Sequence, residues 1–266
     1  MPANFSRPLR PRKRFGQHFL HDSAIIRRIV ESVYISEGDS VVEIGPGRGA
    51  LTGLLANRCN NLHLIEIDRD LAVRLRERYA DDLSVTVHRE NVLKFDFVGL
   101  ARQLNSTLVV VGNLPYNIST ALLIRLLSQL ESIREMIFMV QSEIAVRLTA
   151  DPGGGNYGRL TVMVGRSCKV KPLFQVGPEA FTPPPNVHSA VIQLSPRPTP
   201  LGPVVQARLF ESIVRDAFSQ RRKTLRNALK QYSIEPALAT LEIDPTLRPE
   251  RLSIEQFAAL AAILEN

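Results

Sequence analysis

The sequence has very few cysteines. Its 266 residues include only Cys59 and Cys168, which lie far apart in the chain. Two distant thiols exclude a disulfide framework and a CxxC zinc site, so we expect a protein of the reducing cytoplasm. The 5 histidines are scattered, and the PCxxC and HxE elements of a zinc deaminase are missing, so we also expect no metal.

Long apolar runs are also missing. No run approaches the roughly 20 residues that a membrane helix needs, so we expect no membrane contact. The first segment, MPANFSRPLRPRKRFGQHFL, has no acidic residue and no apolar signal core, and its prolines break an amphipathic targeting helix. We therefore expect residues 1–21 to form a basic, partly ordered arm.

Acidic residues are fewer than basic ones. The chain has 26 Asp and Glu against 33 Lys and Arg, a formal charge of +7. This excess favours a polyanionic partner such as nucleic acid, although a basic protein without such a partner has the same composition. With 44% hydrophobic residues, the chain can bury one large core, or a large and a small one.

Strand-like and helix-like segments alternate over the first two thirds of the chain. Short apolar or β-branched runs lie at 40–45, 62–67, 83–88, 107–112 and 136–141, with helical patterns between several of them. Such alternation predicts an α/β fold with a mostly parallel sheet and helices on both faces. The late runs TVMVGRSCKVK and SAVIQLSP predict an antiparallel pair at the sheet edge.

The composition changes at SPRPTPLGP, residues 195–203, where Pro and Gly become frequent. The segments that follow have helical periodicity without clear strands. We therefore expect an α/β domain over residues 22–196 and a small all-α domain over residues 204–266.

A glycine-rich segment, VVEIGPGRGALT, follows the first strand. Gly45, Gly47 and Gly49 lie between a strand and a helix, where the backbone passes close to a ligand. Glu66 follows Gly47 by 19 residues, at the end of the next strand, where a carboxylate binds ribose hydroxyls. The GxGxG spacing differs from the GxGxxG of a pyrophosphate site and favours a nucleoside cofactor without phosphates, although a dehydrogenase stays an alternative.

A second unusual segment is STLVVVGNLPYNIST, residues 106–120. Its apolar run breaks into Asn113, Leu114, Pro115 and Tyr116. An ordinary turn would explain an amide and a proline at a strand end. This segment alone does not distinguish a structural turn from a functional site, so other segments of the chain are needed.

Together, EIGPGRG, the strand-ending EID and NLPYNIS resemble the Rossmann-like S-adenosylmethionine-dependent methyltransferases that modify exocyclic amines. RKRFGQHFL, FTPPPNVHSAV at 181–191 and RRKTLRN at 221–227 narrow the resemblance to the ribosomal RNA adenine dimethyltransferase family, over nearly the whole chain. The most similar type is the small-subunit (16S) enzyme that dimethylates two adjacent adenosines. Resistance-type relatives that act on large-subunit RNA are less similar.

The resemblance implies a binding site for S-adenosylmethionine. His18 and Leu20 would contact the methionine end of the cofactor, and Gly45 and Gly47 would be the loop residues of the site. Glu66 would bind the ribose, Asn91 would bind the adenine, and Asn113 would lie near the methyl group. Two positions depart from the family, which usually has Asn at position 18 and Asp at position 91. An amide at position 91 can still accept a hydrogen bond, but without the charge-assisted share.

The resemblance also implies catalytic roles. The Asn113 side-chain carbonyl and the Leu114 backbone carbonyl would accept the two hydrogens of the adenine N6 amine, and Pro115 would fix the backbone. Tyr116 would stack on the base and Phe181 would close its other face. No strong general base is expected, because the nitrogen becomes acidic only once it carries the new methyl group.

Basic residues at two places would bind RNA phosphates, although charged runs are usually solvated helix faces. The expected contacts are Arg12, Lys13, Arg14, Arg221, Arg222, Lys223 and Arg226. The expected partner is small-subunit ribosomal RNA within an assembling subunit, bound by a monomer. The alternatives are a catalytically silent RNA-binding assembly or transcription factor on the same fold, and a large-subunit rRNA adenine methyltransferase.

Overall fold

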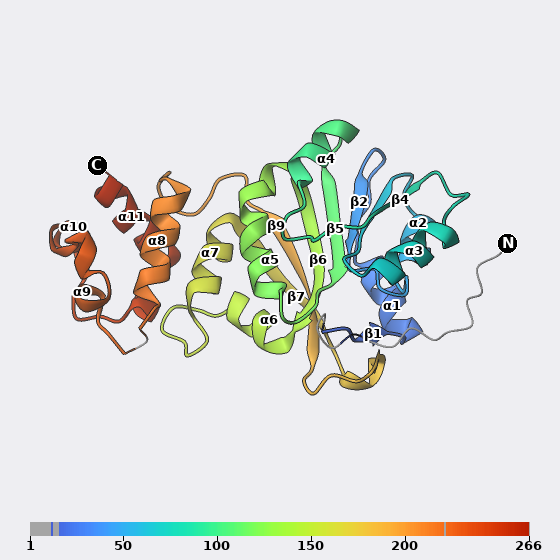
Figure 1. Ribbon diagram of the computed structural model, residues 1–266. Coiled ribbons are helices and arrows are strands. Elements are labelled where there is room, and N and C mark those ends of the chain that lie inside the picture. The colour runs from blue at the N-terminus through green and yellow to red at the C-terminus, as the bar shows by residue number, and fades with distance from the viewer. Residues whose placement is uncertain (1–11, 13–15, 221, 266) are drawn as a thin grey trace.

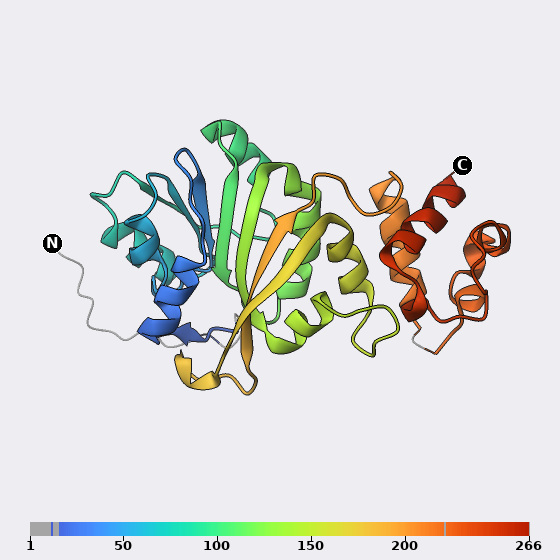
Figure 2. The same cartoon turned by 180° about the vertical axis from the view of Figure 1, so that it is seen from behind.

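A computed structural model describes residues 12, 16–220 and 222–265 (Figure 1). The predictions for Lys13, Arg14, Arg221 and most of the basic arm lie outside the described residues. The described chain forms an α/β body and a group of helices that lies beside it at one end, as both views show (Figures 1 and 2).

The body is built on a seven-stranded sheet with the order β4-β3-β2-β5-β6-β9-β7. Neighbouring strands from β4 to β6 are parallel, whereas β9 is antiparallel to both β6 and β7. This arrangement confirms the predicted parallel sheet with an antiparallel edge. The strands are β2 (Ser40–Ile44), β3 (Leu62–Ile65), β4 (Val85–His88), β5 (Leu108–Asn113), β6 (Ile133–Gln141), β7 (Cys168–Val176) and β9 (Ser189–Pro196).

Helices cover both faces of the sheet. In β5, Val110 packs into the cluster that contains α4 to α7, whereas Val109 and Val111 pack into the cluster that contains α1 to α3. Successive side chains of a strand point to opposite faces, so a strand buried on both faces is apolar throughout. The helices are α1 (Ser23–Glu31), α2 (Thr52–Ala56), α3 (Arg69–Arg78), α4 (Phe97–Leu104), α5 (Ser119–Leu126), α6 (Ser142–Leu148) and α7 (Arg159–Ser167).

The expected strand TVMVGRSCKVK begins too early, because TVMV, residues 161–164, belongs to α7 and the strand β7 begins only at Cys168. Val164 packs into the sheet's cluster, whereas Val162 and Met163 pack into a third cluster with the C-terminal helices. A helix buried between two cores is apolar nearly all round, so its residues form a run that resembles a buried strand.

The C-terminal helices surround this third cluster. They are α8 (Ala207–Ala217), α9 (Leu225–Ala228), α10 (Glu235–Thr240) and α11 (Ile254–Glu265). Arg166 of α7 donates to the carbonyls of Leu201 and Pro203, at 3.3 and 2.8 Å, and its guanidinium lies 4.3 Å from the centre of the Phe210 ring. The helical region therefore shares α7 with the body, and the division into domains over residues 22–196 and 204–266 stays a prediction.

A short antiparallel ribbon joins the arm to the body. It consists of β1 (Phe19–Leu20) and β8 (Phe181–Thr182), in which Leu20 is opposite Phe181. His21 adds a backbone hydrogen bond to Ala180, at 3.0 Å. The ribbon brings the end of the arm beside the sheet (Figure 1). Over the described residues, no helix has both the length and the apolar character to cross a bilayer.

Candidate active site

A cavity of about 260 Å³ opens at the carboxyl ends of the central strands. The strand order runs toward β3 on one side of β2 and toward β5 on the other, and ligands of open α/β sheets bind where the order reverses in this way. Five segments line the cavity: 16–20, 43–51, 65–67, 90–93 and 113–118. The fold therefore brings the arm, the glycine loop and the NLPY segment to one place.

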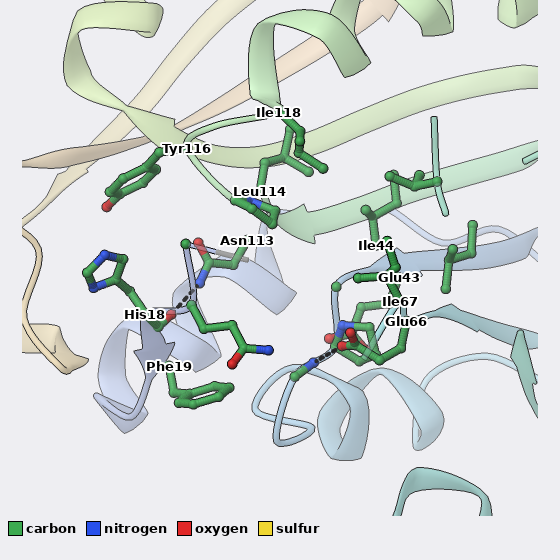
Figure 3. Close-up of a pocket in the computed structure, with 18 of the residues that line it drawn as sticks. His18, Phe19, Glu43, Ile44, Glu66, Ile67, Asn113, Leu114, Tyr116 and Ile118 are labelled. Atoms are coloured by element: carbon green, nitrogen blue, oxygen red, sulfur yellow. Dashed lines mark hydrogen bonds between the residues drawn. The ribbon is translucent and has the colours of Figure 1, made fainter. Parts of the chain in front are cut away.

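The cavity has two ends (Figure 3). We call the region of Gly45, Gly47 and Glu66 the glycine-loop end, and the region of His18, Asn113 and Tyr116 the Tyr116 end. In the close-up, Glu66 lies with the loop at one side, and the rings of His18 and Tyr116 face each other at the other side. Asn113 lies between them.

Glycine is needed in the loop because of the backbone conformation at these positions. Gly45 and Gly47 have φ values of 64° and 59°, in the left-handed region that strains other residues. A β-carbon on Gly47 would also lie 3.3 Å from the Phe19 ring. The predicted role of the loop, which is close approach to a ligand, therefore has a conformational basis.

Glu66 is 5% exposed and is held by two backbone donors. The Gly47 N–H donates to its Oε2 at 3.1 Å, and the Asp68 N–H donates to its Oε1 at 2.8 Å. Burial raises the pKa of this carboxyl group, and the backbone hydrogen bonds oppose that rise. Each carboxylate oxygen keeps a further lone pair, so Glu66 can also accept from a diol.

Glu43 is a cavity residue that sequence reasoning missed. It lies in the middle of β2, is 2% exposed and accepts a hydrogen bond from the Thr52 hydroxyl at 2.7 Å. Burial raises its pKa to about 8, with a smaller contribution from nearby Glu66. The available signal was an acidic residue inside the fully buried strand SVVEI.

Asn91 lines the cavity, as predicted, but its oxygen already has a partner. The Leu93 N–H donates to Asn91 Oδ1 at 3.0 Å, which closes a local turn. An aspartate in this position would have a second oxygen, whereas Asn91 has an NH₂ donor there. The departure from the family pattern therefore removes an acceptor as well as a charge.

Asn113 ends β5 and its amide is anchored by the arm. Its Nδ2 donates to the backbone carbonyl of His18 at 3.2 Å, so Oδ1 is the acceptor end of the side chain. The following turn is closed by the Pro115 carbonyl, which accepts from the N–H groups of Ile118 and Ser119, each at 3.1 Å. Leu114 has a buried side chain and a backbone N–H that donates to Met139 at 3.0 Å. The NLPY segment is thus a rigid turn that also lines a cavity.

Tyr116 and His18 are stacked on each other. Their ring centroids are 5.6 Å apart with planes inclined by 26°. The Tyr116 hydroxyl is 2.7 Å from Ser189 Oγ, and burial raises the pKa of the phenol. His18 Nδ1 is 2.8 Å from the Pro183 carbonyl, so the ring connects the turn with the segment after β8. The His18 ring therefore faces Tyr116, and the predicted contact of His18 with the methionine end of the cofactor stays a prediction.

Phe181, expected to close over the target base, does not line the cavity in this structure. The ring is 2% exposed and packs into the cluster of the α1 face, and Phe181 is absent from the described residues that line the cavity. Pairing of β8 with β1 fixes this position, because it places Phe181 opposite buried Leu20. In the described arrangement, the ring that covers Tyr116 belongs to His18.

Arg12 does not present a free charge for a phosphate. Its guanidinium is 3.2 Å from Asp68 Oδ1 and 2.5 Å from Asp70 Oδ2, so it is paired within the protein. Arg222 and Lys223 lie in the α8–α9 loop, and Arg226 of α9 pairs with Glu235 at 3.3 Å. This loop lies among the C-terminal helices at one end of the molecule, whereas α3, whose first residues Arg12 contacts, lies toward the other end (Figures 1 and 2).

Comparison with known proteins gives consistent results. The model of the family described as "Ribosomal RNA adenine dimethylase" matches residues 9–266. A Pseudomonas aeruginosa protein named "Ribosomal RNA small subunit methyltransferase A" is 48% identical over 252 residues, which cover 95% of this chain and 94% of the relative. A Nitrosococcus oceani protein with the same name is 50% identical over 251 residues, 94% of this chain and 95% of the relative.

Two solved structures are similar over most of the chain. A dimethyladenosine transferase from Plasmodium falciparum has a TM-score of 0.78 at 26% identity and covers 91% of this chain and 96% of its own. The 23S rRNA methyltransferase ErmE has a TM-score of 0.68 at 27% identity, with 93% and 100% covered. With the family match over nearly its full length, the chain belongs to the ribosomal RNA adenine dimethylase family.

Proposed function

We propose that this protein transfers methyl groups from S-adenosylmethionine to the N6 amines of two adjacent adenosines in small-subunit ribosomal RNA. The observation that carries the proposal is the meeting of the NLPY turn and the glycine loop in one cavity. Relatives of 48% and 50% identity are named for the small subunit, whereas the large-subunit enzyme is 27% identical. These values favour small-subunit RNA over large-subunit RNA.

The residues of the glycine-loop end fit S-adenosylmethionine. The left-handed glycines make a close backbone approach possible, and Glu66 can accept hydrogen bonds from the ribose. The cavity of about 260 Å³ is large enough for part of such a ligand. When bound, S-adenosylmethionine supplies an electrophilic methyl group on a positively charged sulfur. Asn91 and Leu20, which also line the cavity, would contact its ends.

At the Tyr116 end, the protein directs the lone pair of the amine. The N6 lone pair of adenine is delocalised into the ring, so the amine is a poor nucleophile. Asn113 Oδ1 and the Leu114 carbonyl would accept the two N–H groups, which localises the lone pair along the direction of attack. Because Asn113 is anchored through Nδ2, its acceptor is oriented before the base arrives. Alignment of this kind contributes up to about 7–11 kcal/mol.

The proton of the amine needs no strong base. The nitrogen becomes acidic after it gains the methyl group, and it then releases its proton to water. Asn113 and Tyr116 are uncharged acceptors or stacking groups, so they do not clamp the product with a charge. The buried acids Glu43 and Glu66 lie at the other end of the cavity, where this mechanism gives them no role in proton transfer.

Stacking of the target base on Tyr116 requires a local movement. Stacked layers of carbon atoms lie about 3.5 Å apart, so a base between two rings needs about 7 Å. The 5.6 Å between the Tyr116 and His18 centroids is too short. The His18 ring therefore shifts or leaves when the base enters.

The expected partner is RNA within an assembling small subunit, bound by a monomer in the cytoplasm. The formal charge of +7 supports a polyanionic partner. Arg222 and Lys223, in the α8–α9 loop, are the basic residues of the C-terminal helices that we propose as phosphate contacts.

Incubation with labelled S-adenosylmethionine and undermethylated small ribosomal subunits tests this function. We expect label in the RNA, and mass spectrometry should find N6,N6-dimethyladenosine at two adjacent positions. Tight RNA binding without label would instead support a silent assembly or transcription factor. Calorimetry that detects NADH binding but no S-adenosylhomocysteine binding would support the dehydrogenase.

A further inference from the structure

Four residues connect the arm to the start of α3, and we call them the arm clamp: Arg12, Gln17, Asp68 and Asp70. The Arg12 guanidinium bridges both carboxylates, at 3.2 Å to Asp68 and 2.5 Å to Asp70. The backbone N–H of Arg12 donates to Gln17 Oε1 at 2.8 Å, and Gln17 Nε2 donates to Asp68 Oδ2 at 3.3 Å. Both arm residues are thus fixed to the same carboxylate.

The arm clamp lies directly behind the cavity. Gln17 lines the cavity together with the adjacent His18 and Phe19. On the other side, the Asp68 backbone N–H donates to Glu66 Oε1 at 2.8 Å. A continuous chain of contacts therefore runs from Arg12 through Asp68 to the acid proposed for the ribose, and from Arg12 through Gln17 to the opposite wall.

Because the Asp68 carboxylate is buried, it depends on Arg12 as its ion-pair partner. The Asp68 side chain is only 4% exposed, whereas those of Arg12 and Asp70 are 35% and 36% exposed. A buried carboxylate is destabilising unless it is paired and hydrogen-bonded. Asp68 Oδ1 also caps α3 by accepting from the Asp70 N–H at 3.0 Å, so the carboxylate cannot turn away without loss of the cap. Arginine suits this place because its planar fork reaches two carboxylates at once.

We infer that Arg12 is a positioning residue for the cofactor, which holds the Gln17–Phe19 wall against the Glu66 side, and is not a phosphate contact. The inference rests on the proposed function, since it concerns the cofactor of that reaction. Without Arg12, the wall has to be ordered when the cofactor binds, and that ordering lowers affinity. At saturating cofactor the wall is in place, so turnover is largely retained.

Arg12→Ala tests the inference, with Arg69→Ala as the matched control. Arg69 also pairs with Asp70, at 3.3 Å, but it is 69% exposed and belongs to α3 rather than to the arm. Each variant removes one positive charge beside the same carboxylate. We expect S-adenosylhomocysteine to bind Arg12→Ala about tenfold more weakly than the parent and Arg69→Ala within about twofold of it. The KM for S-adenosylmethionine should rise in parallel with little change in kcat.

RNA binding separates the clamp from a phosphate contact. Loss of one phosphate contact lowers the slope of log K against log salt by about 0.9. Lys223→Ala should show such a decrease, whereas Arg12→Ala should keep the slope of the parent. A lower slope for Arg12→Ala with unchanged S-adenosylhomocysteine affinity would overturn the inference, as would equal weakening by Arg12→Ala and Arg69→Ala.

Arg12→Lys and Asp70→Asn keep the test independent of folding. Both retain one of the two ion pairs, so we expect affinities between those of the parent and Arg12→Ala, with thermal unfolding of the free proteins unchanged. Parental affinity in both would contradict a bridging role. Failure of the parent itself to bind S-adenosylhomocysteine would refute the proposed function, whereas normal binding by Arg12→Ala would refute only the positioning role.

Discussion

At the glycine-loop end of the cavity, two backbone N–H groups fix Glu66, both from residues close to the strand ends. At the Tyr116 end, the fixed groups come from segments that lie far apart in the chain: the arm anchors Asn113, and Ser189 and His18 contact Tyr116. At the first end, the Glu66 carboxylate is held by residues of the sheet edge and the arm supplies only the facing wall, whereas the second end depends on the arm and on the segment after β8 for its own polar groups. Rearrangement on binding is therefore expected at the Tyr116 end.

The two ends also differ in charge. The glycine-loop end contains Glu43 and Glu66, both buried and both with a raised pKa. The side chains of Asn113, Tyr116 and His18, at the Tyr116 end, are an amide, a phenol and an imidazole. Carboxyl groups at the first end can accept hydrogen bonds from ribose hydroxyls, while uncharged acceptors at the second end suit an amine that must keep its lone pair available.

The largest effect should come from Asn113→Ala. Loss of an oriented acceptor costs about 10²–10³ in turnover, while S-adenosylhomocysteine should bind nearly as before. Glu66→Gln should give the opposite result: a higher KM for S-adenosylmethionine, with turnover largely retained at saturating S-adenosylmethionine. Single-turnover methylation and calorimetry measure the two quantities. Asn117→Ala is the control on the same turn, and equal losses of turnover in both asparagine variants would contradict the assigned acceptor.

Phe181→Ala should primarily destabilise the fold. Replacement of a buried phenylalanine lowers the free energy of unfolding by about 3 kcal/mol. His18→Ala should lower stability by less than about 1 kcal/mol, because the residue lines the cavity, and should change turnover instead. Urea unfolding and methylation rates distinguish the two. If Phe181→Ala kept full stability but lost turnover, the result would support the predicted contact between the Phe181 ring and the target base.

Glu43 should make stability depend on pH. Its pKa of about 8 in the folded protein exceeds the 4.5 of an ordinary glutamate, so the folded state holds the proton more tightly. Its stabilising contribution is complete below about pH 4.5 and is lost as the pH rises through about 8, a change of a few kcal/mol. Glu43→Gln should remove this slope in urea unfolding series, and exposed Glu90→Gln should retain it. An unchanged slope in Glu43→Gln would show that another group titrates.

The smallest effect should come from Asn91→Asp. The second oxygen of an aspartate can accept from the adenine amine while the first keeps the bond to Leu93, so affinity should rise about three- to tenfold. Calorimetry with S-adenosylhomocysteine, which lacks the sulfonium charge, measures this. Asn117→Asp adds the same charge at the Tyr116 end and should not tighten binding. Equal tightening in both would mean that charge alone acts.

Residues whose roles depend on near neighbours were predicted well. The strand periodicity and the alternation with helices indicated the parallel sheet, because side-chain burial follows local spacing. Gly47 and Glu66 line one cavity because the strand–loop–helix context places both at the same edge of a parallel sheet, and their contacts with a cofactor stay predictions. Glu43 was missed because an acid inside an apolar strand gives no sign of which groups will surround it.

The sheet, the glycine loop and the NLPY turn could be predicted from the sequence, since each depends on residues that are close together in the chain. Three other features could not be predicted in this way: α7 lies between two cores, Phe181 is buried beneath the arm, and Arg12 pairs with Asp68 and Asp70. These features arise from contacts between distant segments. The spacing of residues along the chain does not show which acidic residue will pair with a given basic residue, or which segment will pack against a given apolar ring.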